Sequence, residues 1–274
     1  MSNLESTLRT YDVRTGETRT VFSLPNHYEA PNWTPDGTEL VVNSDGRLYR
    51  VPADGSDDPA VVDTGDVTDI INDHGVSPSG DRLAFTSDGH VWTAPIDGGD
   101  PTRVTDRAPS YWHGWSPDGE RLAYCGERDG AHNVYTIALD GGPERRLTGG
   151  DSYDDGPDYT PDGRILYYCS DRSGSWELWR VAADGGTPER VTDEQTENWF
   201  PHPSPDGETA VYLAYPPGTE GHPPERDVQL RLLDLETHES RRLCSLFGGQ
   251  GTINVPSWHP DGDRFAFVSY RRRD

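Results

Sequence analysis

Short runs of alternating apolar and polar residues recur along the whole chain. Examples are RLAYCGE at 121–127 and RILYYCS at 164–170, and each unit continues with a second run such as ELWRVAADGG at 177–186 and a short stretch such as PERVT at 188–192. Alternation with a period of two predicts β-strands that bury one face. We therefore expect an all-β chain built from units of four short strands.

A tight turn marks each unit and gives the repeat its period. A Pro-Asp-Gly triplet or a near match occurs six times, with glycine-to-glycine spacings of 43, 39, 44, 44 and 55 residues. Pro fixes φ, Asp bonds its own backbone and Gly takes positive φ in such a turn. Four strands in a unit of this length are typical of a propeller blade. The triplets begin at Pro35, Pro78, Pro117, Pro161, Pro205 and Pro260.

The chain ends predict how the ring closes. Only one strand-like run, at 264–274, follows the sixth triplet, whereas the N-terminus offers two, at 6–13 and 18–24. We expect a single domain over residues 1–274, an all-β six-bladed propeller of four-stranded blades. Its last blade would join an inner pair from 252–270 to an outer pair from 6–24, which removes open edges. The other blades are predicted at 25–64, 70–105, 110–148, 153–192 and 197–243.

These repeats also carry a family resemblance. SPDGERLAYCGERDGAHNVYTIALDGG and TPDGRILYYCSDRSGSWELWRVAADGG are similar to the repeats of TolB-like β-propellers, and the likeness extends over almost the whole chain. It implies the fold more strongly than a function, because such repeats occur in a periplasmic scaffold, in peptidase propellers and in a manganese-dependent oligogalacturonate lyase. We expect this chain to lack the scaffold's leader and extra domain, the hydrolase domain, and one blade of the lyase.

Composition indicates a habitat. Acidic residues number 48 and basic residues 24, every basic residue is Arg, and the net charge is −24. This balance resembles that of halophilic proteins, in which concentrated salt screens the repulsion between carboxylates. An acidic protein from a GC-rich bacterium is the alternative. The same charge argues against nucleic acid or an anionic membrane as partner.

The absence of Lys removes several kinds of chemistry. A Walker A loop, a Schiff-base lysine and an S-x-x-K nucleophile all require that side chain. The N-terminus has no basic-then-apolar signal, and no run approaches eighteen apolar residues, so we expect a cytoplasmic protein.

One mouth of the ring is the predicted ligand site. The connections that enter each inner strand meet there, and the position eight residues before each turn Gly varies among polar and aromatic types. A ligand-facing rim would vary in this way, and so would a solvated mouth. Trp199 offers a stacking face, and a glycine-rich connection at 245–256 brings Gln250 close. The predicted ligand-binding residues are Glu29, Asn72, Tyr111, His113, Asp155, Trp199, Gln250 and Asn254.

The histidines raise a second prediction for the same mouth. Four of the nine lie five to ten residues ahead of a turn Gly. Imidazoles that converge there would bind a divalent transition metal, with amide or carboxylate oxygens completing the shell. The alternative is that they are solvated or stacked. The candidate ligands are His27, His74, His113 and His202.

Two functions from different classes follow. The first is a non-catalytic propeller that binds a protein partner or a small polar ligand, such as a carbohydrate, at the mouth. The second is a carbohydrate-active enzyme, a lyase or hydrolase, with Glu29, Asp155 or Asp158 as acid or base. Catalysis stays undecided, because paired carboxylates arise by chance in a chain this acidic.

Overall fold

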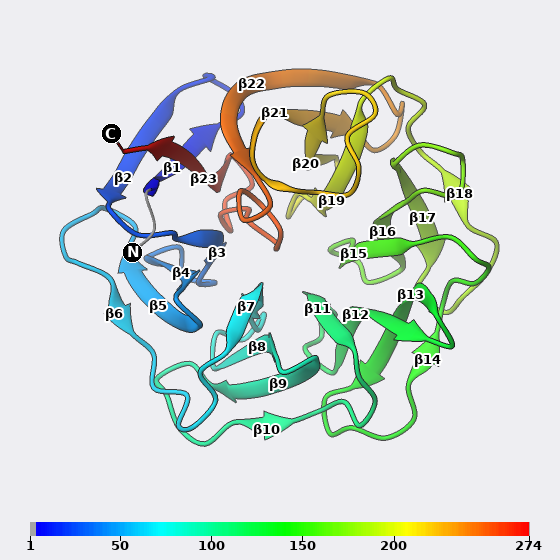
Figure 1. Cartoon of the computed structure of the whole chain (residues 1–274), viewed down its shortest axis with the longest axis horizontal. Coiled ribbons are helices and arrows are strands. Elements are labelled where there is room, and N and C mark those ends of the chain that lie inside the picture. The colour runs from blue at the N-terminus through cyan, green and yellow to red at the C-terminus, as the bar shows by residue number, and fades with distance from the viewer. Residues whose placement is uncertain (1–3, 274) are drawn as a thin grey trace.

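The computed structural model describes residues 4–273 and confirms the predicted propeller. Six antiparallel sheets surround a central axis, and the described residues contain no helix. Accordingly, no helical segment among them could span a membrane. In Figure 1 the strands β3, β7, β11, β15 and β19 lie nearest the centre of the ring.

Five blades have four strands each, ordered along the chain. Blade one contains β3 (Glu29–Trp33), β4 (Glu39–Ser44), β5 (Arg47–Pro52) and β6 (Ala60–Val61). Blade two contains β7 (Ile70–Val76), β8 (Arg82–Ser87), β9 (His90–Pro95) and β10 (Thr102–Arg103). Blade three contains β11 (Ser110–Trp115), β12 (Arg121–Arg128), β13 (Ala131–Ala138) and β14 (Arg145–Arg146). Blade four contains β15 (Asp154–Tyr159), β16 (Ile165–Ser170), β17 (Glu177–Ala182) and β18 (Glu189–Arg190). Blade five contains β19 (Glu197–Pro203), β20 (Thr209–Tyr215), β21 (Pro224–Asp234) and β22 (Ser240–Gly249).

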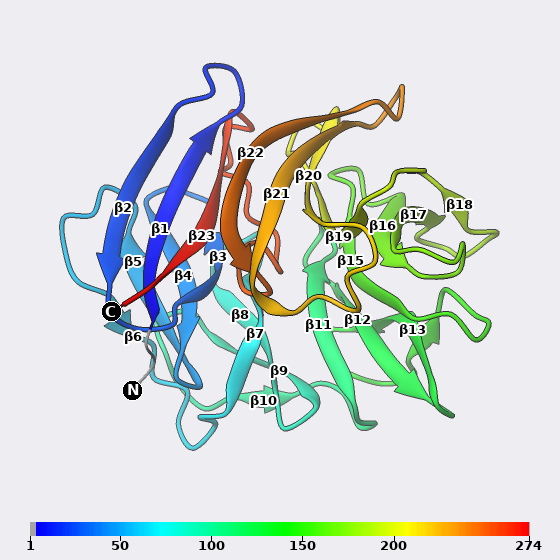
Figure 2. The same ribbon diagram turned by 45° about the horizontal axis from the view of Figure 1, so that its top comes forward.

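Blade six closes the ring with strands from both ends of the chain. Its sheet has the order β2-β1-β23, with β1 at Leu4–Asp12, β2 at Thr18–Leu24 and β23 at Arg264–Arg272. β1 pairs with β23 over nine residue pairs, from Leu4 with Arg272 to Asp12 with Arg264. Figure 2 shows β1 between these two partners. The predicted joining of the two ends is confirmed.

Two boundaries differ from the sequence prediction. Blade five was expected to end at 243, but β22 continues to Gly249, because it pairs with the long β21 over its whole length. In blade six, residues 252–258 lie along β23 without forming a regular strand. Their contacts are a bridge between Trp258 and Phe265 and a few backbone bonds, among them Ala266 N–H to the Ser257 carbonyl at 2.8 Å.

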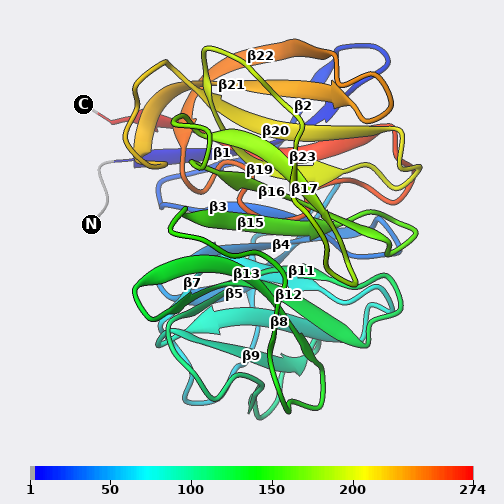
Figure 3. The same ribbon diagram turned by 90° about the vertical axis from the view of Figure 1, so that its right-hand side faces the viewer.

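The turn face is held by one bonding pattern. The Thr160 hydroxyl donates to Asp162 at 2.7 Å, and Asp162 accepts the Arg164 N–H at 3.1 Å. Equivalent bonds link Ser116 to Asp118 and Ser204 to Asp206. Figure 3 shows the ring from the side, with strands running between this face and the opposite one. These aspartates therefore bond to the backbone of their own turns, as the sequence predicts.

An irregularity in the inner strands shapes the opposite face. Each of β3, β7, β11, β15 and β19 carries a bulge near its start. In three of them the residue seven before the turn Gly has positive φ: Ala30 at 54°, Gly156 at 61° and Phe200 at 54°. A bulge turns side chains out of the strand's regular alternation. The residues at the start of each inner strand therefore surround the central mouth.

Candidate functional site

A pocket of about 230 Å³ lies on the central axis. Its walls come from the starts of β7, β11, β15 and β19, from the β20–β21 connection, and from the segment after β22, which curls toward the middle of the ring in Figure 1. Five blades thus contribute to one cavity. It is lined by Ile71, Asn72, Asp73, Tyr111, His113, Tyr153, Asp155, Phe200, His222, Gln250 and Asn254.

A buried ion pair crosses this pocket. His113 Nε2 lies 3.0 Å from Asp155 Oδ1, and His113 Nδ1 lies 3.4 Å from the Asn254 carbonyl. Burial alone would lower the pKa of His113, but the negative charges of Asp73 and Asp155 raise it to about 9. Burial raises the pKa of Asp155, and the charge and hydrogen bond of His113 outweigh that effect and lower it. At neutral pH the pair is therefore ionised.

Asp73 is the second carboxyl group of the pocket. The residue exposes 7% of its surface, and no hydrogen bond from the described residues contributes to its electrostatics. Burial raises the pKa of Asp73 to about 7, with the His113 charge opposing this and the Asp155 charge adding to it. A carboxyl group so placed is energetically costly to ionise unless a cation or donor approaches it.

Phe200 forms an aromatic wall of the first pocket, and its backbone adopts an unfavourable conformation. A bulky residue at φ 54° is unusual, because the left-handed region crowds Cβ. The His113 ring lies 5.9 Å from the Phe200 ring, and the His222 ring lies 5.2 Å from it on another side. Strained backbone of this kind persists where the surrounding packing fixes it, often at functional sites.

A second pocket of about 360 Å³ adjoins the first and shares Ile71, Asn72 and Gln250 with it. Glu29 and His27 stand in its wall, with Glu29 Oε1 at 3.6 Å from His27 Nε2. Burial raises the pKa of Glu29 to about 8 and lowers that of His27. At neutral pH both groups are thus largely uncharged, and the two pockets form one polar cleft.

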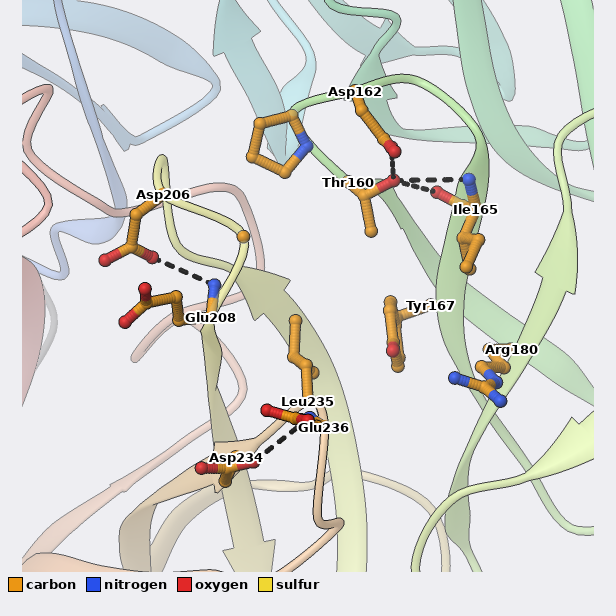
Figure 4. Close-up of a pocket in the computed structure, with 12 residues that line it drawn as sticks. Thr160, Asp162, Ile165, Tyr167, Arg180, Asp206, Glu208, Asp234, Leu235 and Glu236 are labelled. Carbon is orange, nitrogen blue, oxygen red and sulfur yellow. Dashed lines mark hydrogen bonds between the residues drawn. The ribbon is translucent and has the colours of Figure 1, made fainter.

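A more voluminous groove lies away from the axis. A groove of about 620 Å³ separates blades four and five on the turn face, between the turn at Pro161–Asp162 and the turn at Asp206–Glu208 (Figure 4). Asp162 and Asp206 bond to their own turns there. The groove follows from the spacing of two neighbouring blades, and its turn carboxylates are already engaged.

Seven of the eight predicted ligand residues line the two central pockets. Asn72, Tyr111, His113, Asp155, Gln250 and Asn254 line the first, and Glu29 lines the second. Trp199 does not. It is 1% exposed, because its ring lies 3.7 Å from that of Trp176 and 5.6 Å from that of Phe200, so it supports the pocket wall from behind.

The four histidines proposed as metal ligands are not brought together. His113 lines the first pocket and His27 the second, while His74 and His202 are fully buried. His202 Nδ1 lies 3.1 Å from Asp158 Oδ2, so Asp158 is held in a contact between blades and lines neither pocket. Over residues 4–273, no group of three His, Cys, Asp or Glu side chains is arranged to hold a metal ion.

Three polar residues of the first pocket were missing from the sequence prediction. His222 comes from the long β20–β21 connection, which was expected to cover the mouth without naming a side chain; its Nε2 lies 3.8 Å from Asp155 Oδ2. Asp73 and Tyr153 fall outside the eight-residue offset. The bulges shift the inner strands by different amounts, so a single offset from the turn could not find them.

The charge of Glu29 gives a testable pH effect. Its folded pKa is raised from 4.5 to about 8, so the associated stability is present below pH 4.5 and is lost as pH rises through about 8. Relative to wild type, Glu29→Gln should gain about 2 to 4 kcal/mol of unfolding free energy at about pH 9, and under about 1 kcal/mol at about pH 5. Urea unfolding at both pH values measures this. Glu17→Gln, in an exposed turn, is the matched control; an equal gain there would contradict the explanation.

Fold and site together define a six-bladed propeller with a polar pocket on its axis. A family model described as the TolB beta propeller domain matches residues 107–221. An uncharacterised protein of Agrobacterium fabrum is 45% identical over 273 residues, which is 98% of this chain and 93% of that protein. The chain belongs to the TolB-like β-propeller family.

Comparison with solved structures supports this family assignment. That of a TolB candidate from Agrobacterium tumefaciens is 45% identical, with a TM-score of 0.95 over 98% of this chain and 99% of that one. An oligogalacturonate lyase in complex with manganese is 18% identical, with a TM-score of 0.59 over 88% of this chain and 73% of the lyase. At that identity the likeness to the lyase concerns the fold alone.

Proposed function

We propose that this protein is a non-catalytic TolB-like propeller that binds a small polar ligand in the central pocket. The supporting observation is the convergence of polar and aromatic side chains from five blades on one cavity of about 230 Å³. Binding sites are typically concave, with a few convergent polar groups among apolar walls. The volume lies below the roughly 300 to 1,000 Å³ of drug-sized sites, which favours a small molecule over a folded protein partner as the occupant of the pocket.

A thermal-shift experiment with three probes tests this function. Choline, D-glucose and D-galacturonate represent cationic, neutral and anionic small ligands. At least one should raise the melting temperature at millimolar concentration, because a ligand that binds only the folded state stabilises it. The Tyr111→Ala variant should weaken that binding by about tenfold or more, since it removes a half-exposed pocket wall.

The control for this experiment is Tyr49→Ala, which removes another half-buried tyrosine remote from the pocket. Binding should be unchanged in this variant. If no probe binds, or if both variants lose the same affinity, the central pocket is not the ligand site.

The alternative is a carbohydrate-active enzyme at the same mouth. The raised pKa values of Asp73 and Glu29, about 7 and about 8, favour it, because general acids work best near the operating pH. Within residues 4–273, no arginine lines either pocket, which disfavours a polyuronate substrate. Incubation with polygalacturonate should therefore release no ultraviolet-absorbing unsaturated product; its appearance, lost in Asp73→Asn, would establish the enzyme.

We also propose a cytoplasmic protein adapted to concentrated salt. The net charge of −24, carried with no Lys, supports this. Six aspartates and no basic residue occupy positions 51–69, a local density that dilute buffer would not screen.

A further inference from the structure

We infer that the ligand of the central pocket is a small ammonium cation, a quaternary ammonium compound or a protonated amine. This inference rests on the proposed function and adds the chemical class of the ligand. It stands on three properties of the pocket: the charges of its lining residues, an unpaired buried carboxyl group and three aromatic walls.

The charged lining residues disfavour an anionic ligand. Asp73 and Asp155 supply two carboxyl groups, the adjoining pocket adds the exposed Asp45, and no arginine among the described residues lines either pocket. Carboxylate and phosphate ligands are usually held by a permanent cation, most often the arginine fork. Among the described residues, His113 is the strongly basic group of the cavity, and its positive charge is opposed by Asp155 at 3.0 Å and by the charge of Asp73.

Asp73 is the one carboxyl group of the first pocket that accepts no hydrogen bond from the described residues, although the charge of His113 favours its ionised form. Asp155 has the His113 ring at 3.0 Å, the Gly156 N–H at 2.8 Å and the His222 ring at 3.8 Å. Asp73 is 93% buried in the cavity wall, at 7% exposure, and lacks comparable contacts. A buried carboxylate without a partner is unfavourable, so a ligand that supplies positive charge would replace the missing partner.

The walls suit an alkylated cation rather than a metal ion. Tyr111, Tyr153 and Phe200 enter the same cavity from three blades. Aromatic faces attract ammonium groups through the ring quadrupole, and aromatic cages are the usual receptors for quaternary ammonium. A bare divalent cation would instead need several oxygen or nitrogen ligands, and residues 4–273 contain no such cluster.

Isothermal titration with two isosteres tests this inference. Choline and 3,3-dimethylbutan-1-ol have nearly the same shape, and only choline is charged. Wild-type protein, in a fixed KCl concentration, should bind choline about tenfold or more tightly than the neutral alcohol. Asp73→Asn should remove most of that difference by weakening choline alone, because it keeps the shape of the side chain and deletes the charge.

The control variant is Asp88→Asn, which removes an exposed carboxylate that lines neither pocket. It should leave the choline affinity within about twofold of wild type, since an exposed charge is well screened. Equal binding of the two isosteres, no choline binding, or equal losses in the two variants would each overturn the inference. If glucose or galacturonate binds in a Tyr111-dependent manner while choline does not, the ligand site stands and only the cation class is wrong.

Discussion

A chain lacking residues 1–24 should fail to form a cooperatively folded ring. That deletion removes β1 and β2 and leaves β23 without the strand that pairs with it over nine residues. It also removes Leu8, which is fully buried, and Leu4 and Tyr11, which are 6% and 7% exposed. Three buried side chains of this size contribute roughly 5 to 8 kcal/mol, comparable with the total stability of about 5 to 15 kcal/mol expected for a domain.

Circular dichroism melting and gel filtration would measure this loss. The expected product shows no sharp melt and elutes as aggregate, because the freed edge of β23 can pair with other chains. Removal of residues 272–274 is the control, since the Arg272 side chain is 67% exposed and forms a surface ion pair with Glu225. Such pairs contribute at most about 1 kcal/mol. A truncated chain 25–274 that melts within a few degrees of wild type would show that the N-terminal strands do not close the ring.

The ring and most of its mouth were predictable because the repeat fixes the register of every blade. The turn glycine always lies at the same place, so a fixed offset from it selects the start of each inner strand. This offset correctly placed Glu29, Asn72, Tyr111, Asp155 and Asn254 on the two central pockets. The other two candidates that line the pockets, His113 and Gln250, came from the histidine positions and from the glycine-rich connection at 245–256.

The parts of the site that the sequence did not predict depend on three-dimensional packing, which the repeat period does not encode. Trp199 shares the offset but is covered by Trp176, which lies on the neighbouring blade. His222 reaches the pocket from a connection whose length was evident and whose path was not. The histidine set does not converge, because His74 and His202 are fully buried and line neither pocket, whereas His113 lines the first.

The stability of this protein should rise steeply with salt. Its net charge of −24 is carried on 11822 Å² of surface, and the carboxylates are unevenly distributed. Asp57, Asp58, Asp66 and Asp69 are all exposed within one stretch of blade one and its exit. Charges closer than the Debye length, about 10 Å at 0.1 M salt and 3 Å at 1 M, repel one another until salt becomes molar. This repulsion opposes the compact state.

We therefore expect the urea midpoint of wild-type protein to increase continuously from about 0.01 M to beyond 1 M KCl. A variant with Asp57, Asp58, Asp66 and Asp69 all changed to Asn should be more stable than wild type at low salt, because four negative charges are removed from one region. At molar KCl the two proteins should become nearly equal, since screening has already abolished the repulsion that the variant lacks. A wild-type midpoint that is flat over this range would rule out salt adaptation. A variant whose advantage persists in molar KCl would assign the gain to local packing or turn geometry instead of charge.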